Sequence, residues 1–267
     1  MVFSADFKRL FDKWWYVFRY NLTAAQAGIT ANLLSMFGRS IEALSVLYVW
    51  NIGNPSVSVF TYLIIGRIYK GIAENYFWGS MSTDIITGTL NGKLLRPSSL
   101  VLTSYIQMIG RRVVRNLLEL ASFIISGTLA VLLFARIEIN PEKIPLLILF
   151  IPLTFTINFF LGYIFGSMAF FLKDKREFDS LSLTYSSIHT VLAGFIIPLN
   201  LLPGQELITK LPFAWIIHYP MQVYLGEVKG WGIVSAWLGG VAWCIGLYLL
   251  AKYIFNKGLK LNEAVGL

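Results

Sequence analysis

Residues 84–97 read Asp-Ile-Ile-Thr-Gly-Thr-Leu-Asn-Gly-Lys-Leu-Leu-Arg-Pro, a short, basic and amphipathic stretch between two long hydrophobic segments. Charged side chains are costly in hydrocarbon, so Asp84, Lys93 and Arg96 exclude this stretch from the interior of a membrane. The segments on either side are apolar enough to enter one. The sequence therefore predicts a surface segment that the aqueous phase can reach.

The composition is that of an integral membrane protein. Apolar residues make up 56% of the chain and charged residues only 13%, against about 25% charged in soluble domains. The mean hydropathy is +0.66. The net charge is +8, but the basic residues punctuate hydrophobic segments instead of clustering, which argues against a nucleic-acid partner. The single cysteine, Cys244, excludes an intrachain disulfide and a cysteine metal site.

Residues 1–21 predict an amphipathic helix that lies in the membrane interface. Phe7, Phe11 and Trp14 fall on one face at helical spacing, whereas Arg9 and Lys13 fall on the other side. Two interpretations are open. The helix is either an elbow that docks against a partner and supports the bundle, or a plain membrane-surface anchor, because amphipathicity alone does not separate them.

Six hydrophobic segments predict six membrane-spanning helices, since about 20 apolar residues cross ~30 Å of hydrocarbon. They lie near residues 27–50, 57–78, 112–134, 144–172, 181–202 and 233–255. The expected fold is therefore an all-α integral membrane protein. A single domain covers residues 22–267, with the surface segment at 80–100 between spans two and three.

The distribution of Lys and Arg predicts the orientation, because cytoplasmic loops carry an excess of both. One side of the membrane holds Lys8, Arg9, Lys13, Arg19, Lys93, Arg96, Arg111, Arg112, Arg115, Lys173, Lys175, Arg176, Lys252, Lys257 and Lys260. The other side holds Arg136, Lys143, Lys210 and Lys229. Both termini and the surface segment are therefore expected in the cytoplasm.

Five charged residues fall within the first two spans: Arg39, Glu42, Arg67, Lys70 and Glu74. A hairpin about Asn54 brings Glu42 and Arg67 to nearly the same depth, which predicts an ion pair between them. Lys70 reaches Glu74 one helical turn on. The cluster is either structural, joining packed helices, or its surplus positive charge lines a path for anionic or zwitterionic headgroups.

The segment at 203–230, between spans five and six, is apolar but too short to cross the membrane. Its expected outer gate comprises Pro212, Trp215, His218, Tyr219 and Pro220. The prolines and amphipathic aromatics favour short re-entrant helices that dip into the outer leaflet and return. The alternative is a surface loop whose aromatic rings rest on the headgroups.

The sequence predicts neither a catalytic residue nor a metal site. His189 and His218 belong to no H-E-x-x-H pattern. Gly88 and Gly92 are one residue too close for a Walker A loop, and Leu94 replaces its magnesium-binding hydroxyl. This chain is therefore not expected to bind ATP through such a loop.

The chain resembles ABC-2-type transporter permeases, specifically the stand-alone permeases of about this length that often occur as paired subunits. The resemblance rests on the amphipathic start, the six spans, the segment Ile86–Leu90 followed by Leu94-Leu-Arg-Pro97, and Leu211–Pro220 before the last span. Asn91-Gly92 departs from the family pattern, because it interrupts the helix where other members more often continue it.

The resemblance implies the multi-pass permease of an exporter in the cell membrane, with membrane lipids around it. Its partners would be two ABC ATPase subunits, which bind ATP and Mg²⁺, and a second permease, identical or homologous. The ATPase-coupling residues would be Asp84, Thr87, Leu90, Lys93, Leu94, Leu95, Arg96 and Pro97, within a cytoplasmic coupling helix. Arg111, Arg112 and Arg115 would form the cytoplasmic base of the third span. The cargo would be an amphipathic lipid, glycan, peptide or drug-like molecule.

Two alternatives stay open. An ion-coupled secondary transporter would use the intramembrane charge cluster as its coupling site, although no inverted repeat is apparent. A scaffold subunit would transport nothing. Dependence on a co-expressed ATPase separates the permease from both.

Overall fold

The computed structural model describes residues 2–26, 29–73, 75, 77–95, 99–134, 137–172 and 174–264. Helices make up most of the described residues, which contain no strand. An all-helical fold is what hydrocarbon demands of an apolar chain, because every backbone donor and acceptor is satisfied within its own segment.

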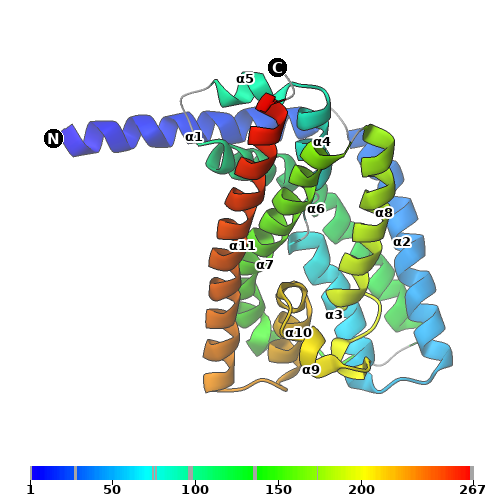
Figure 1. Cartoon of the computed structure of the whole chain (residues 1–267). Helices are drawn as coiled ribbons and strands as arrows, with labels where there is room; N and C mark the ends of the chain where they lie inside the picture. The colour runs from blue at the N-terminus through cyan, green and yellow to red at the C-terminus, as the bar shows by residue number, and fades with distance from the viewer. Residues whose placement is uncertain are drawn as a thin grey trace.

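Long helices run along the bundle: α2 (Ile29–Ile52), α3 (Val57–Ala73), α6 (Leu100–Phe134), α7 (Ile144–Ser167), α8 (Lys175–Leu192) and α11 (Trp231–Ala264) (Figure 1). Helix α1 (Val2–Gln26) lies across one end, where α4 (Phe77–Ile86), α5 (Leu90–Leu94) and the C-terminus also lie. Short helices occupy the chain between the long ones: η1 (Pro141–Lys143), η2 (Met168–Phe171), η3 (Leu199–Leu201), α9 (Gln205–Ile208), η4 (Pro212–Trp215) and α10 (His218–Leu225). Both α9 and α10 lie toward the end opposite α1.

Helix α7 is the central helix of the bundle and packs against α3, α4, α10 and α11. It is hydrophobic all round, as a helix surrounded by others must be. Two of its polar side chains, Thr154 and Asn158, bond to neighbouring helices inside the core. Tyr69 Oη lies 2.7 Å from Thr154 Oγ1, and His189 Nε2 lies 2.9 Å from Asn158 Oδ1. These bonds fix α3 and α8 against α7.

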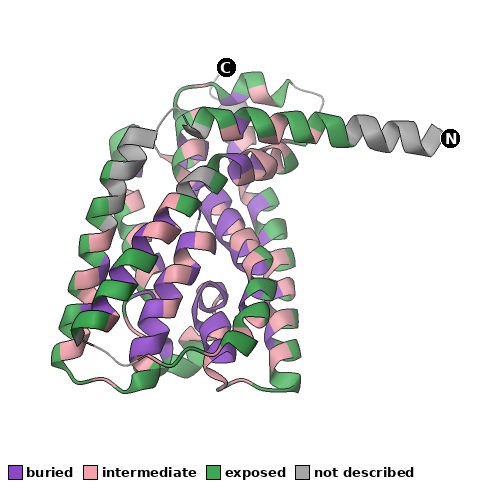
Figure 2. Ribbon diagram, turned by 180° about the vertical axis from the view of Figure 1, so that it is seen from behind, coloured by how far each residue is buried: buried purple, intermediate pink, exposed green. Residues whose placement is uncertain are grey.

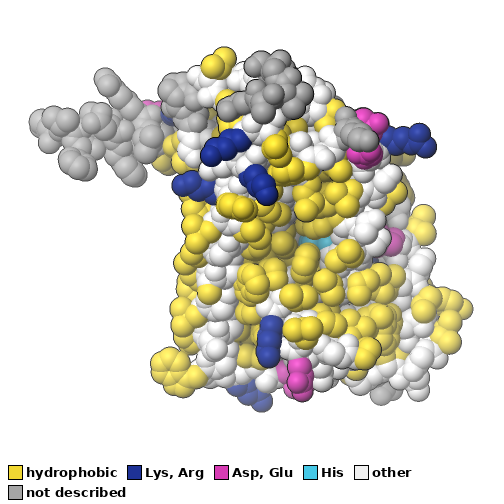
Figure 3. Space-filling view, viewed as in Figure 1, with side chains coloured by type: hydrophobic (Ala, Val, Ile, Leu, Met, Phe, Trp, Pro, Cys, Tyr) yellow, Lys and Arg dark blue, Asp and Glu magenta, His cyan; other side chains and the backbone are white. Residues whose placement is uncertain are grey.

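The outer faces of most of the long helices are strongly apolar, and α8 is the exception. Buried residues face inward and exposed ones outward (Figure 2), and hydrophobic side chains cover the flank of the bundle (Figure 3). Among the described residues, Pro141–Phe171 and Trp231–Leu261 are each long and apolar enough to cross a membrane. The two arms of α6, Leu100–Val113 and Leu117–Leu133, meet at a 46° bend and would together make a third such helix. The chain is thus an all-α, multi-pass membrane protein.

Several helix boundaries differ from those expected. Helix α3 ends at Ala73, where the predicted second span continues to Trp78. The chain is held at this break by the buried Asn75, whose Nδ2 donates to the carbonyl of Phe155 on α7 at 3.0 Å. Helix α8 begins at Lys175, because Asp174 Oδ1 accepts the N–H of Glu177 at 2.9 Å and caps it. It ends at Leu192, well before the predicted end, and Gly194 follows with φ +83°.

Another difference is the start of α6, at Leu100 instead of near Arg112. The end of the added turns contacts α1, at Gly110 and Arg111. The expected interruption at Asn91-Gly92 is also wrong: both residues lie within α5, and the chain turns earlier, at Gly88 with φ +72°.

Candidate functional site

The predicted coupling segment lies at the end of the bundle crossed by α1 and consists of α4, a turn at residues 87–89 and α5. Asp84 on α4 forms an ion pair with Lys93 on α5 and accepts a hydrogen bond from Thr89 Oγ1 at 3.1 Å. Thr87 Oγ1 donates to the carbonyl of Thr83 at 2.7 Å. These polar side chains bond to one another and to the backbone, and so stabilise the turn between α4 and α5.

The apolar residues of the segment divide into an anchor and a tip. Leu90 is buried in a cluster with Phe77, Met81 and Met108. Leu94 is partly exposed, and Leu95 is 86% exposed to solvent. Arg96 and Pro97 lie outside the described residues. The structure therefore presents an anchored helical turn with an apolar tip formed by Leu94 and Leu95.

Arg111 joins this segment to α1. Its Nε donates to Asn21 Oδ1 of α1 at 2.9 Å, and its Nη1 lies 3.5 Å from Ser80 Oγ of α4. Directly beneath this contact, a Cβ at Gly110 would lie 2.7 Å from the carbonyl oxygen of Phe18, so α1 and α6 touch backbone to backbone. Helix α1 is therefore packed against α6 at Phe18 and Asn21.

Arg112 does not lie at an open base of the helix, as the sequence suggested. It is buried, and its Nη1 lies 4.0 Å from Glu119 Oε1, with side-chain exposures of 7% and 3%. The two residues stand on either side of the α6 bend. The side chain of Arg115 lies outside the described residues. Sequence reasoning missed Glu119, although its spacing of seven residues from Arg112 places both on one helix face.

The predicted pair between the first two spans is formed. Arg67 Nη1 lies 3.7 Å from Glu42 Oε1, with side-chain exposures of 5% and 60%. Lys70 Nζ lies over the ring of Phe195, 4.2 Å from its centroid. Glu74 and the side chain of Arg39 lie outside the described residues. The hairpin geometry was thus predicted correctly, and the cation–π contact of Lys70 was not foreseen.

Neutralising Glu42 is expected to lower both abundance and transport. Glu42→Gln keeps the shape of the side chain but removes the counter-charge of the buried Arg67, at a cost of about 1–3 kcal/mol. The measurement is the amount of folded protein in membranes, together with transport per molecule. Glu138→Gln, on an exposed loop, is the matched control. Wild-type abundance and transport in Glu42→Gln would contradict both the structural and the path hypothesis.

The outer gate is buried between helices. Trp215 Nε1 donates to the carbonyl of Ala236 on α11 at 2.6 Å, and the Trp215 ring closely covers Gly239 and Gly240. Pro212, His218 and Pro220 are buried, and Tyr219 is half-buried with its ring centroid 4.4 Å from that of Trp215. These side chains are therefore packed inside the bundle, and the re-entrant position of the segment in the membrane stays a prediction.

The histidines have structural surroundings. His189 bonds to Asn158 and is surrounded by the rings of Tyr185, Phe195 and Phe213. No group of three His, Cys, Asp or Glu residues in the described chain is arranged to hold a metal ion. The exposed Leu94 and Leu95, at the end of the bundle that carries α1, α4 and α5, are instead suited to contact with a partner.

Comparison with known proteins identifies the family of the chain. A family model described as "ABC-2 family transporter protein" matches residues 30–266, almost the whole chain. No curated protein and no solved structure matches it. The chain therefore belongs to the ABC-2 transporter family, whose members are the membrane-spanning, generally non-catalytic permeases of ABC-type transporters.

Proposed function

We propose that the chain is one of two permeases in an ATP-driven exporter, and that α4 and α5 couple it to separate ATPase subunits. In this proposal it crosses the cell membrane six times, through α2, α3, α6, α7, α8 and α11, with both termini in the cytoplasm. ATP and Mg²⁺ bind to the two ATPase subunits. The cargo is an amphipathic molecule, lipid-like, glycan or drug-like.

The observation that carries this proposal is the apolar tip of α5. Leu95 is almost fully exposed on a segment that the Asp84–Lys93 pair and the buried Leu90 hold in one shape. An anchored apolar residue at an aqueous surface is typical of a docking contact. The segment lies at the end of the bundle that α1 crosses, which suits an ATPase that pushes on the bundle from the cytoplasm.

Arg111 supports the transmission of that push. It bonds α1 and lies close to α4, and it stands on the long helix α6. A displacement of α4 and α5 would therefore move α1 and α6 together as packed levers. Neither the displacement of α4 and α5 nor the movement of α1 and α6 requires a chemical reaction on this chain.

The outward face of α8 supports a second permease. It carries Ser180, Thr184 and Ser187 beside the exposed Leu183, a mixture that is poorly suited to lipid. Small hydroxyl residues are frequent where membrane helices meet. We place the second permease, or the path between the two permeases, against this face.

Co-purification with the ATPase encoded beside the chain tests the proposal. Leu95→Asp is expected to reduce the recovered ATPase at least about tenfold, because burying a leucine contributes ~1.5–3 kcal/mol. Leu207→Asp, at an exposed leucine of α9, is the matched control and should retain the ATPase. If no ATPase binds the wild-type chain, the proposal fails. Transport driven by an ion gradient alone would then favour the secondary-transporter alternative, with Glu42 and Arg67 at its coupling site.

A further inference from the structure

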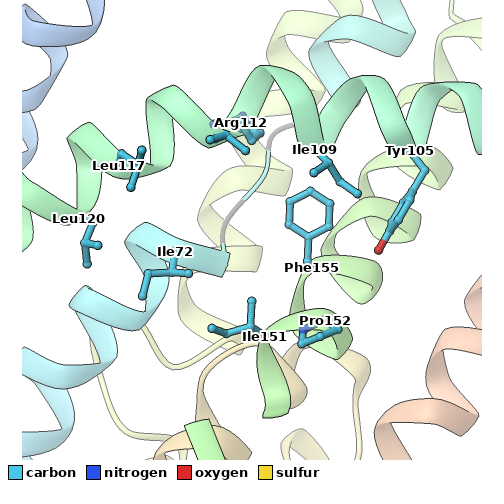
Figure 4. Close-up of a pocket in the computed structure, with 10 residues that line it drawn as sticks. Ile72, Tyr105, Ile109, Arg112, Leu117, Leu120, Ile151, Pro152 and Phe155 are labelled. Atoms are coloured by element: carbon cyan, nitrogen blue, oxygen red, sulfur yellow. The ribbon is translucent and has the colours of Figure 1, made fainter. Parts of the chain in front are cut away.

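A pocket of about 480 Å³ opens between α3, α6 and α7 (Figure 4). Its walls are almost entirely hydrocarbon or aromatic. The two polar side chains among its described lining residues have protein partners. Arg112 Nη1 lies 4.0 Å from Glu119 Oε1, and Tyr105 Oη lies 2.9 Å from Thr156 Oγ1. Such a pocket can take up an apolar group, but its walls do not select one ligand over another.

A groove of about 320 Å³ between α4 and α8 has a more selective chemistry. Trp78 and the buried Phe178 give it an aromatic side, and Lys175 and Asp179 of α8 are its charged residues. Most of the other described lining residues carry hydroxyl groups: Ser82, Thr83, Thr87 and Ser182. The groove is therefore polar, and its volume suits a small ligand or the headgroup of a larger one.

The two charged residues of the groove have opposite signs. Lys175 and Asp179 are one helical turn apart, so they lie on the same face of α8, about 5–6 Å from each other at Cβ. Both residues are exposed, and no ion pair in the described part of the chain includes either of them. A phosphate joined to an ammonium group by two carbon atoms carries the complementary charges at a similar spacing.

The hydroxyl groups of the groove favour one kind of ammonium group. Ser82 and Thr83 donate to the carbonyl of Gly79 at 3.1 and 2.8 Å, and Ser182 donates to the carbonyl of Asp179 at 2.7 Å. Each hydroxyl hydrogen is thus used within its own helix, which leaves the oxygen lone pairs as acceptors. Acceptors suit a primary ammonium, which has three N–H donors, better than a trimethylammonium, which has none.

The groove also lies where lipid headgroups are expected. Figure 1 shows α4 at the end of the bundle that α1 crosses, and α8 begins at the same end. An amphipathic helix such as α1 lies at the boundary between headgroups and acyl chains. The exposed Ile86 gives the groove an apolar edge that a lipid can meet.

We propose that this groove binds the headgroup of a phosphatidylethanolamine lipid, in which a phosphate is linked to a primary ammonium. The ammonium lies among the Asp179 carboxylate and the hydroxyl oxygens, the phosphate lies against Lys175, and the acyl chains stay in the bilayer. The inference goes beyond the permease proposal, since it needs neither an ATPase nor a cargo.

Native mass spectrometry of the purified, delipidated chain tests this site. The probes are palmitoyl-oleoyl phosphatidylethanolamine and palmitoyl-oleoyl phosphatidylcholine, which share acyl chains, phosphate and net charge. We expect one phosphatidylethanolamine per chain, held at least about tenfold more tightly than phosphatidylcholine, because the latter has no N–H to donate to a charged acceptor. Equal retention of both lipids, or retention of neither, would overturn the proposal.

Four single variants locate the site. Asp179→Ala should abolish the preference between the two lipids, and Lys175→Ala should weaken the retention of both, because both carry the phosphate. Glu177→Ala and Arg176→Ala are the matched controls, exposed on the same part of α8 but not among the described lining residues, and they should behave as the wild type. A preference that survives Asp179→Ala, or that either control abolishes, would place the lipid elsewhere.

Glycerophosphoethanolamine, the same headgroup without acyl chains, identifies the source of the ligand. It should not displace phosphatidylethanolamine at equal concentration, because the detergent micelle concentrates the lipid beside the groove. Displacement at equal concentration would make a soluble phosphoethanolamine compound the ligand and overturn the lipid assignment. The assay contains no ATPase, so its failure leaves the permease proposal untouched.

Discussion

Replacing Glu119 with leucine is expected to destabilise the chain by ~3–5 kcal/mol, the cost of removing one partner of a buried ion pair. Arg112 and Glu119 are both buried, and Arg112 also lines an apolar pocket. The leucine would leave the guanidinium without this counter-charge in surroundings that solvate it poorly. The measurement is the thermal unfolding midpoint of the purified chain, which should fall by roughly 10 °C.

A double variant distinguishes the charge from the packing. Arg112→Met/Glu119→Leu replaces the pair by apolar side chains of similar size, and it should recover most of the lost stability. Glu206→Leu, at an exposed position of α9, is the control for the substitution itself and should change little. If the double variant is as unstable as Glu119→Leu, the loss reflects packing at the bend and the importance assigned to the ion pair is wrong.

The length of the apolar segments and the helical spacing of apolar residues made much of this architecture predictable. Most of the long apolar segments and the amphipathic start appear in the structure as helices near their expected positions, because burial in lipid and packing both select hydrophobic faces. Helix α8 begins and ends well before the expected fifth segment. The Glu42–Arg67 pair was predictable for a similar reason. One turn at Asn54 fixes the hairpin, so depth follows from counting residues.

The neighbouring arginines show where such counting stops. Arg111 and Arg112 are adjacent in sequence, and both were expected at an open cytoplasmic base. Successive helical residues point about 100° apart, so Arg111 faces α1 and α4 while Arg112 faces the interior. Which face of α6 is buried depends on where α3 and α7 pack against it, and the sequence of α6 alone does not specify this.

The coupling segment shows a second limit. Asp84 and Lys93 lie on different helices, and only the turn at Gly88 brings them together. Periodicity within one helix cannot link such residues, so both were read as contacts for a partner. In the structure they bond to each other and hold the loop, and the exposed apolar residues of the segment are Leu94 and Leu95. Burial in the folded chain, not residue type, separates the two roles.

The close approach of α1 to α6 leads to the second large effect, which is on transport. Gly110→Leu is expected to separate the two helices, because even a Cβ there would lie 2.7 Å from the Phe18 carbonyl oxygen. That oxygen belongs to the backbone, so α1 itself must move, and the Arg111–Asn21 bond is lost with it. Gly246→Leu is the matched control on α11, since a Cβ at Gly246 would meet nothing within 4 Å.

In the proposed mechanism α1 and α6 move together. Gly110→Leu should therefore impair transport while leaving ATPase binding intact. The Asp84–Lys93 ion pair joins α4 directly to α5, so the tip should keep its shape without the α1–α6 contact, and the ATPase should still co-purify. Transport into proteoliposomes should fall at least about tenfold, equivalent to ~1.4 kcal/mol of lost coupling. Trypsin should cleave after Arg19 faster than in the wild type, because the helix is no longer packed. Full transport from a chain whose α1 is readily cleaved would show that α1 is only a membrane anchor, and the force would then have to pass from α4 into the bundle directly.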